Sequence, residues 1–261
     1  MFGKKKKVVG IALSGGGSRG VAHLGALKAL EELGVDIQVV SGTSAGSIAA
    51  ALYACGLSTD DIYKVMKDKK FIDYAKIILP VDGLMNLDNL RKTLNEIIKK
   101  KDFSEMNKKL YIALTNLYSG EVEYMKSGNV IDAVIASSSI PVLFSPVEIN
   151  GQKYVDGGVL DNLPIKPLLE DCDIIIAVDV MATGPVSKIE NLHDVGVRTF
   201  QLSISTLSKE MKRKCNLLIE PHGLSEFNIL DVSHFDQIYK IGYYSVMGHP
   251  KLPKLLAKIK K

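Results

Sequence analysis

Two glycine-rich turns near the N-terminus each follow a short apolar run. Gly15–Gly20 reads Gly-Gly-Gly-Ser-Arg-Gly and follows Val8–Leu13, while Gly42–Gly46 reads Gly-Thr-Ser-Ala-Gly and follows Val35–Val40. Short runs without polar alternation are typical of parallel strands covered on both faces. Because the carboxyl ends of parallel strands meet at one edge of a sheet, we expect both turns to lie at that edge.

The rest of the chain continues this alternation of strands and helices. Further strand-like runs occur at Leu110–Leu114 and Ile174–Val180. Apolar residues recur at helical spacing in Val21–Leu33 and Leu87–Lys101, and Ser47–Cys55 is an alanine-rich segment that ends at Gly56. The pattern predicts a three-layer α/β/α sandwich with a mainly parallel sheet.

Two hairpins make the predicted sheet mixed. Tyr111–Met125 turns at Ser119-Gly120, and Val147–Val155 turns at Asn150-Gly151, the strongest two-residue turn signal. No repeat or linker interrupts the chain, so we predict a single domain over residues 1–261.

One apolar segment, Phe71–Asn86, has no clear period and is interrupted by Pro80 and Gly83. Long irregular stretches in compact domains often serve as lids or binding loops. Two interpretations stay open for this segment: a lid or wall of an acyl pocket, and an ordinary crossover through the core.

Composition narrows the class of protein. A hydrophobic content of 46% and a charged content of 24% fit a folded domain with a large core. The net charge is +4, and much of the basic excess lies in Lys4–Lys7 and Lys251–Lys261. Because no basic stripe with interleaved aromatic residues runs through the body, we expect no nucleic-acid partner. The basic ends fit solvated tails or peripheral contact with an anionic membrane.

Cysteine usage and hydropathy indicate the compartment. Cys55, Cys172 and Cys215 are widely spaced, with no Cys-x-x-Cys pair, which is typical of reduced core residues in an intracellular protein. No apolar stretch approaches the roughly 18 residues of a membrane span. We therefore predict a cytoplasmic protein, with peripheral contact at the inner membrane surface as an alternative.

Ser44 is the candidate nucleophile. Gly42 and Gly46 frame it, and Ala45 follows it, in a strand-to-helix turn that can lift the hydroxyl to the sheet edge. The N-terminus of the next helix points its amides and the positive end of its dipole toward this serine.

The first glycine loop is a candidate oxyanion hole. The amides of Gly15, Gly16 and Gly17 could reach the same edge, where each oxyanion donor supplies about 3–4 kcal/mol. Gly20 closes the loop, and Arg19 either adds positive potential or anchors it. The same loop fits a dinucleotide-binding fingerprint, but the acidic residue which that fold needs after its second strand is absent.

Asp156 is the candidate base, because Asp156-Gly157-Gly158 ends a hairpin strand where a carboxylate can turn back across the sheet edge. The other interpretation of that sequence is a turn-forming aspartate. An ordinary aspartate has a pKa of about 3.9, so a base near neutral pH needs a fairly dry pocket. A Ser-His-Asp arrangement also stays open, through His193, His222, His234 or His249; His23 lies in the first helix.

Several blocks together resemble the patatin-like phospholipases in order and approximate spacing. They are Gly15–Gly20, Gly42–Gly46, Ala136–Pro141 with Phe144 and Pro146, Asp156–Gly158, and Asp161–Pro164, all within residues 8–180. The resemblance implies a patatin-like α/β/α fold, with Ser44 as nucleophile, Asp156 as base and Gly15–Gly17 as oxyanion hole.

The resemblance also implies the chemistry: hydrolysis of lipid acyl esters by a two-residue dyad, with no metal or cofactor. Two alternatives remain, an esterase with a Ser-His-Asp triad and a lipid-binding or membrane-docked regulator without turnover. The regulator would use Leu252–Lys261 as a short interfacial helix, and the same spacing also fits a helix docked on the core.

Overall fold

The computed structural model describes residues 6–68, 87–141, 143–181, 189–190, 192–207, 209–229 and 233–260. Within these residues eight strands form one sheet, in which hydrogen-bonded neighbours follow the path β5-β6-β3-β2-β1-β7-β8 and β4 also pairs with β3. The strands are β1 (Val9–Leu13), β2 (Val39–Gly42), β3 (Lys109–Asn116), β4 (Val122–Met125), β5 (Val147–Ile149), β6 (Gln152–Asp156), β7 (Ile174–Val178) and β8 (Leu217–Ile219). The helices are α1 (Val21–Glu32), α2 (Ala45–Ala54), α3 (Thr59–Lys67), α5 (Asp88–Ile97), α6 (Val130–Ser137), α7 (Leu192–Leu207), α8 (Lys209–Lys212), α9 (Phe235–Met247) and α10 (Leu252–Ile259).

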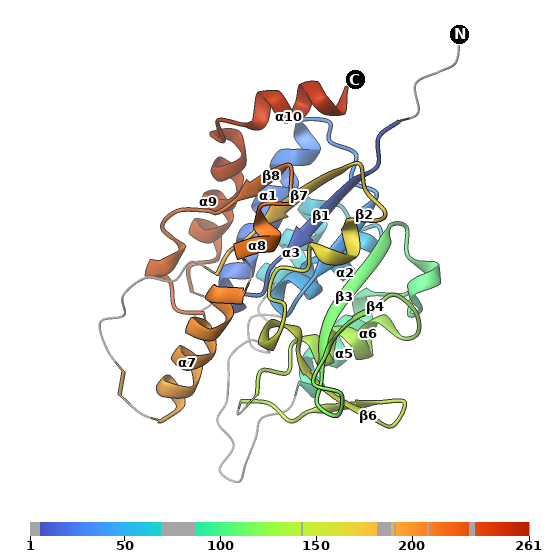
Figure 1. The fold of residues 1–261 in the computed structure, drawn as a ribbon, viewed down its shortest axis with the longest axis vertical. Helices are drawn as coiled ribbons and strands as arrows, with labels where there is room; N and C mark the ends of the chain where they lie inside the picture. Colours follow the sequence, from blue (N-terminus) through green and yellow to red (C-terminus); the bar gives the residue numbers. More distant parts are fainter. Residues whose placement is uncertain are drawn as a thin grey trace.

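The predicted α/β/α sandwich is confirmed. Alternate residues of the central strand β1 face opposite layers: Ile11 and Leu13 join the large core with α1, α2 and α6, whereas Ala12 joins a smaller core on the other face. That second face is covered by the 3₁₀ helix η4 (Lys166–Leu168) and by residues near α8. In Figure 1, α8 lies in front of the sheet, and α1, α2 and α6 lie behind it. Burial on both faces explains why β1 and β7 are continuous apolar runs.

The sheet is mostly parallel on one side and antiparallel on the other. β8, β7, β1, β2 and β3 run parallel to one another. β4 pairs antiparallel with β3, and β5 with β6, through the two predicted hairpins, and β6 also pairs antiparallel with β3. At the second hairpin Asn150 and Gly151 have φ values of 51° and 76°, which are the left-handed conformations that an Asn-Gly turn supplies at little cost.

Two strands share a single edge of β3. Ile112 pairs with Gly42 of β2 and with Met125 of β4, so β2 and β4 lie on opposite edges. Leu114 pairs with β4 and with Asp156, which places β6 on the same edge as β2. Because β2 runs parallel to β3 and β6 antiparallel, the two strands approach each other and end on either side of Ala113. This meeting point positions the candidate site.

The second strand begins later than the sequence predicts. The apolar run Val35–Val40 is buried at Val35 and Ile37, but sheet pairing starts only at Val39. The N–H of Val35 donates to the carbonyl of Leu30 at 3.0 Å, so it closes the end of α1 and is not available to the sheet. Burial alone therefore extended the predicted strand too far.

The C-terminal helix α10 is docked on the core. Leu252 and Leu255 are buried in the large hydrophobic cluster, with Leu256 and Ile259 packed against it. Lys7 donates to the carbonyl of Lys258 at 2.7 Å, so the residues just before β1 lie against α10. None of the described helices has the length and hydropathy needed to cross a bilayer. The predicted lid or pocket wall at Phe71–Asn86 lies outside the described residues.

Candidate active site

The turn that carries Ser44 is strained and tightly packed. Ser44 has φ 52° and ψ −125°, and only one other described residue with a Cβ atom has a positive φ. A Cβ on Gly42 would stand 2.4 Å from the carbonyl oxygen of Gly46, and a Cβ on Gly46 would stand 2.3 Å from that of Leu13. Glycine at both positions lets β2 turn directly into α2, which is the close approach that a nucleophile elbow needs.

Ser44 occupies the N-cap position of α2. The amide of the next residue, Ala45, has no hydrogen-bond acceptor among the described residues, whereas Gly46 and Ser47 donate to the carbonyls of Thr43 and Ser44. The serine is 8% exposed. Its hydroxyl therefore lies at the positive end of a helix with little water around it, a setting that favours negative charge on oxygen.

Asp156 is a buried carboxyl at the end of β6. It is 1% exposed, and its Oδ1 accepts a hydrogen bond of 2.7 Å from the amide of Gly158. Burial raises the pKa of Asp156 to about 7, and hydrogen bonding from the nearby Ser44 hydroxyl and from Gly158 opposes that shift. Its other oxygen, Oδ2, accepts no hydrogen bond of ordinary length within the described part of the chain. The carboxyl thus has a free acceptor oxygen and a pKa suited to exchanging a proton near neutral pH.

The glycine loop lies beside Ser44. A Cβ on Gly15 would stand 3.1 Å from the Cβ of Ser44. The Gly15 amide donates to the carbonyl of Asn162 at 3.1 Å, so it is engaged within the protein. By contrast, no described residue accepts a hydrogen bond from the amides of Gly16 and Gly17. Of the three predicted oxyanion donors, Gly16 and Gly17 are therefore the ones whose amides can donate a hydrogen bond to a ligand.

Arg19 and Gly20 support this loop from within the protein. Arg19 is 6% exposed and donates to the carbonyls of Phe227 at 2.9 Å and Ser225 at 3.4 Å. Burial, followed by repulsion from Arg198, lowers the pKa of Arg19. A Cβ on Gly20 would stand 2.7 Å from that of Ala45, so this glycine lets the loop pack on α2. The described hydrogen bonds of the guanidinium thus go to backbone carbonyls.

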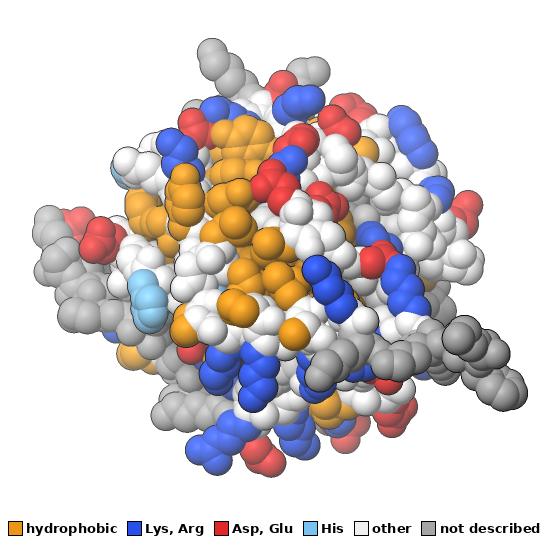
Figure 2. All heavy atoms as spheres, turned by 90° about the horizontal axis from the view of Figure 1, so that it is seen from above, with side chains coloured by type: hydrophobic (Ala, Val, Ile, Leu, Met, Phe, Trp, Pro, Cys, Tyr) orange, Lys and Arg blue, Asp and Glu red, His pale blue; other side chains and the backbone are white. Residues whose placement is uncertain are grey.

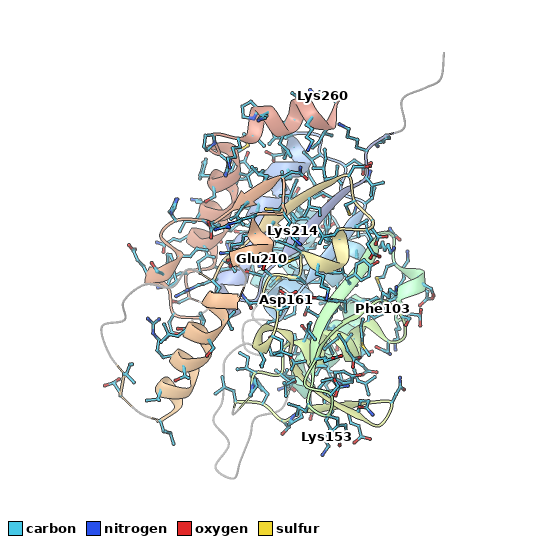
Figure 3. The ribbon with its side chains drawn as sticks, in the orientation of Figure 1. Phe103, Lys153, Asp161, Glu210, Lys214 and Lys260 are labelled. Atoms are coloured by element: carbon cyan, nitrogen blue, oxygen red, sulfur yellow. The ribbon has the colours of Figure 1, made fainter. Side chains whose placement is uncertain are left out.

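A segment after Asp156 ties the two turns together. The hydroxyl of Thr43 donates to the carbonyl of Asp161 at 3.0 Å, and that of Ser41 donates to Pro164 at 2.6 Å. The side chain of Asp161 accepts a hydrogen bond of 2.6 Å from Tyr124, and burial raises the pKa of Asp161 to about 6. Figure 3 labels Asp161 near the middle of the molecule, well away from Lys260 on α10 at its upper end.

Sequence reasoning assigned no role to two residues that the fold brings to this site. Asn162 is 4% exposed, and its Oδ1 lies 2.4 Å from the position of a Cβ on Gly15 and 2.9 Å from that on Gly158. Ser137, at the end of α6, accepts a hydrogen bond from the Ser44 amide at 2.9 Å. Both lie in blocks that resemble the patatin-like family, but nothing in a serine run or a lone asparagine distinguishes such contacts.

The histidines make their described contacts elsewhere. His23 is wholly buried, and its Nε2 lies 2.8 Å from the carbonyl of Ser14; burial lowers its pKa to about 4. His249 contacts the carbonyl of Leu218, and His234 contacts Gln237. His222 is exposed, and the side chain of His193 lies outside what the structure describes. None of the described histidine hydrogen bonds reaches Ser44 or Asp156.

A serine on a strained strand-to-helix turn, beside a glycine loop and a buried carboxyl, is the arrangement of an α/β protein with a nucleophile elbow. A family model described as patatin-like phospholipase matches residues 11–169, more than half of the chain. The chain belongs to the patatin-like phospholipase family.

Curated relatives are much longer than this chain. Lysophospholipase NTE1 of Meyerozyma guilliermondii is 28% identical over 270 residues, which cover 91% of this chain and 19% of the relative. Lysophospholipase NTE1 of Kluyveromyces lactis is 29% identical over 287 residues, which cover 97% and 20%. The chain therefore spans about a fifth of the length of these relatives.

A solved structure shares the fold. The crystal structure of VipD from Legionella pneumophila matches with a TM-score of 0.56 at 17% identity, covering 97% of this chain and 67% of that one. At this identity the likeness bears on architecture alone.

Proposed function

We propose that the chain is a serine lipid acyl hydrolase that cleaves acyl esters of phospholipids, lysophospholipids or related lipids. Ser44 is the nucleophile and Asp156 is the base. The observation that carries this proposal is the pairing of a strained serine at the N-cap position of α2 with a buried carboxyl whose pKa is raised to about 7. The absence of a histidine from the described contacts of both residues favours a two-residue dyad.

The first stage forms an acyl-enzyme. The Ser44 Oγ attacks the ester carbonyl carbon while the Asp156 carboxylate takes the hydroxyl proton. The carbonyl oxygen becomes an oxyanion, which accepts hydrogen bonds from the amides of Gly16 and Gly17. When the tetrahedral intermediate collapses, the bond to the alcohol oxygen breaks and Asp156 returns its proton to that oxygen. The alcohol leaves, and the acyl group remains on Ser44.

The second stage reverses these roles with water. The oxygen of a water molecule attacks the acyl carbon while Asp156 takes a proton from that water, and the same glycine amides donate hydrogen bonds to the new oxyanion. Collapse breaks the bond to the Ser44 Oγ, which regains a proton from Asp156. The fatty acid leaves, and both residues return to their starting state.

The lipid substrate class is supported by family membership and by the relatives' names. The family model is described as patatin-like phospholipase, and the two relatives are named lysophospholipases. A dry site also suits this class, because the burial that raises the pKa of Asp156 is compatible with an acyl chain lying nearby.

Hydrolysis of a lysophospholipid and of a soluble short-chain ester tests the proposal. We expect wild type to release fatty acid from both and Ser44→Ala to release it from neither. Ser245→Ala is the matched control, because that hydroxyl is bonded within α9 to the carbonyl of Ile241. Full turnover by folded Ser44→Ala would overturn the nucleophile assignment. If folded wild type binds lipid without turnover, a non-catalytic lipid binder replaces the hydrolase.

A further inference from the structure

Ser137 links the candidate nucleophile to β3, the strand along which both the Ser44 turn and the candidate base lie. It is the last residue of α6 and is wholly buried. Its Oγ accepts a hydrogen bond of 2.9 Å from the Ser44 amide and donates one of 2.7 Å to the carbonyl of Ala113. One hydroxyl thus bridges the backbone of the turn that follows β2 and the backbone in the middle of β3.

Ala113 lies where the pairing of β3 changes from β2 to β6. On the edge of β3 that β2 and β6 share, pairing with β2 stops at Ile112 and pairing with β6 begins at Leu114. The carbonyl of Ala113 falls at this junction, where a Cβ on Gly157 would stand only 2.2 Å from it. The Ser137 hydroxyl therefore occupies the break in the ladder between the Ser44 turn and the turn that follows Asp156.

The neighbouring serines do not make this contact. Ser139 is also buried, but its hydroxyl donates to the carbonyl of Ile135 at 2.9 Å, within the end of α6. Ser138 Oγ has no hydrogen-bond partner among the described residues. Of this serine run, Ser137 alone has a described hydrogen bond to Ser44.

We propose that Ser137 is a positioning residue, which holds the Ser44 backbone in its left-handed conformation so that the hydroxyl faces Asp156. Residues with a Cβ rarely adopt such φ and ψ values, and they persist there only when their surroundings fix them. The Ser44 amide is fixed by a side chain that is itself fixed to the sheet. This inference rests on the proposed function, since it matters only if Ser44 is the nucleophile.

The test measures how fast Ser44 is acylated, separately from how well the site binds. A fluorophosphonate ester with an alkyl chain is applied to wild type, Ser137→Ala, Ser137→Cys, Ser139→Ala and Ser44→Ala. Labelling rates at several probe concentrations give the reversible binding constant and the maximal labelling rate. Thermal unfolding supplies the folded fraction of each variant.

We expect Ser137→Ala to lower the maximal labelling rate by about 10- to 100-fold, with the binding constant unchanged, because small misplacements of a nucleophile have effects of this size. Ser137→Cys nearly keeps the side chain's size but hydrogen-bonds weakly, so its maximal labelling rate should lie between those of Ser137→Ala and wild type. Ser139→Ala removes a buried hydroxyl that lies just beyond the end of α6 and bonds to the carbonyl of Ile135, so this variant should label like wild type. A merely structural role would lower the unfolding temperature of both alanine variants and leave their labelling rates, per folded molecule, unchanged.

Two failures are distinguishable. If Ser44→Ala labels as fast as wild type, the proposed function itself is wrong. If Ser44→Ala is unlabelled while Ser137→Ala labels like wild type, only the positioning role is overturned. Should Ser137→Ala not fold, Ser137→Cys decides: a rate equal to that of wild type contradicts the inference, and a reduced rate supports it.

Discussion

Gly42 and Asp156 end two strands that run toward each other along one edge of β3, where they pair with Ile112 and Leu114. Ser44 lies two residues beyond Gly42, so the hydroxyl and the carboxyl come from strand ends separated by one residue of the same neighbouring strand. Sheet register thus sets the relation between Ser44, the candidate nucleophile, and Asp156, the candidate base.

Activity should rise with pH through an apparent pKa of about 7, because burial raises the pKa of Asp156 to about that value. The base works as the carboxylate, so at lower pH the proton remains on it and the rate falls. The measurement is kcat/KM for a soluble ester across the range in which the protein stays folded. A profile that is flat down to the ordinary pKa of an aspartate would contradict the assignment.

Replacement of the base should stabilise the fold at neutral and higher pH. The folded-state pKa of Asp156 lies above its ordinary value of 3.8, so the unfolded chain loses this proton first. Wild type therefore loses unfolding free energy as pH rises from about 4 to 7, by up to about 4 kcal/mol. Asp156→Asn lacks this loss.

Urea unfolding of wild type and Asp156→Asn near pH 4 and pH 8 measures the effect. The variant's gain over wild type should be larger at the higher pH by a few kcal/mol. Equal differences at both pH values would mean that the carboxyl is not desolvated in the folded protein.

Glycine is required at the elbow by close backbone contact. In Gly46→Ala the new Cβ would stand 2.3 Å and 2.5 Å from the carbonyl oxygens of Leu13 and Ser14. We expect a loss of about 1–3 kcal/mol in unfolding free energy together with loss of activity. Gly196→Ala in α7 is the matched control, since none of the described atoms lies within 4 Å of its Cβ position. That change should stabilise by about 0.5–1 kcal/mol.

Arg19 should act on catalysis through the glycine loop. Arg19→Lys retains the charge but cannot reproduce the hydrogen bonds that the guanidinium fork gives to Phe227 and Ser225. We expect kcat for a soluble ester to fall while KM changes little, because the loop that carries the oxyanion donors loses its anchor. Unchanged kcat with a folded variant would show that the loop keeps its shape without this anchor.

The basic helix α10 lies away from the candidate site, and Lys7 contacts it through the carbonyl of Lys258. In Figure 1 α10 is at the upper end of the molecule, whereas Asp161 in Figure 3 is near its middle. Figure 2 shows that upper end from above, with a band of apolar side chains and lysine or arginine side chains on both sides. Peripheral membrane contact through this end stays a prediction, and hydrolysis of a soluble ester should not depend on it.

The fold was predictable because its signals are local. Apolar runs such as Ile174–Val180 and turn signals such as Asn150-Gly151 depend on residues adjacent in sequence, and the structure confirms β7 and the second hairpin. The start of β2 was not predictable. Val35 is as apolar as a strand residue, but its amide donates to the carbonyl of Leu30 at the end of α1. Apolar periodicity reports burial and does not report which backbone groups are already bonded.

The site was only partly predictable. The glycines on either side of Ser44 and directly after Asp156 are visible in the sequence. They are glycines because a Cβ at Gly42, Gly46 or Gly157 would collide with backbone oxygens. The engagement of the Gly15 amide by Asn162 and the bridge made by Ser137 depend on pairs far apart in the chain. No local pattern encodes such pairs, so they require the register of the sheet.

The most direct test of the Ser44–Asp156 dyad is labelling with a fluorophosphonate probe, followed by mass spectrometric mapping of the modified residue. Wild type should be modified at Ser44, Ser44→Ala should remain unmodified, and Asp156→Asn should be modified far more slowly. Rapid labelling of Asp156→Asn, or modification of folded wild type at another residue, would contradict the dyad.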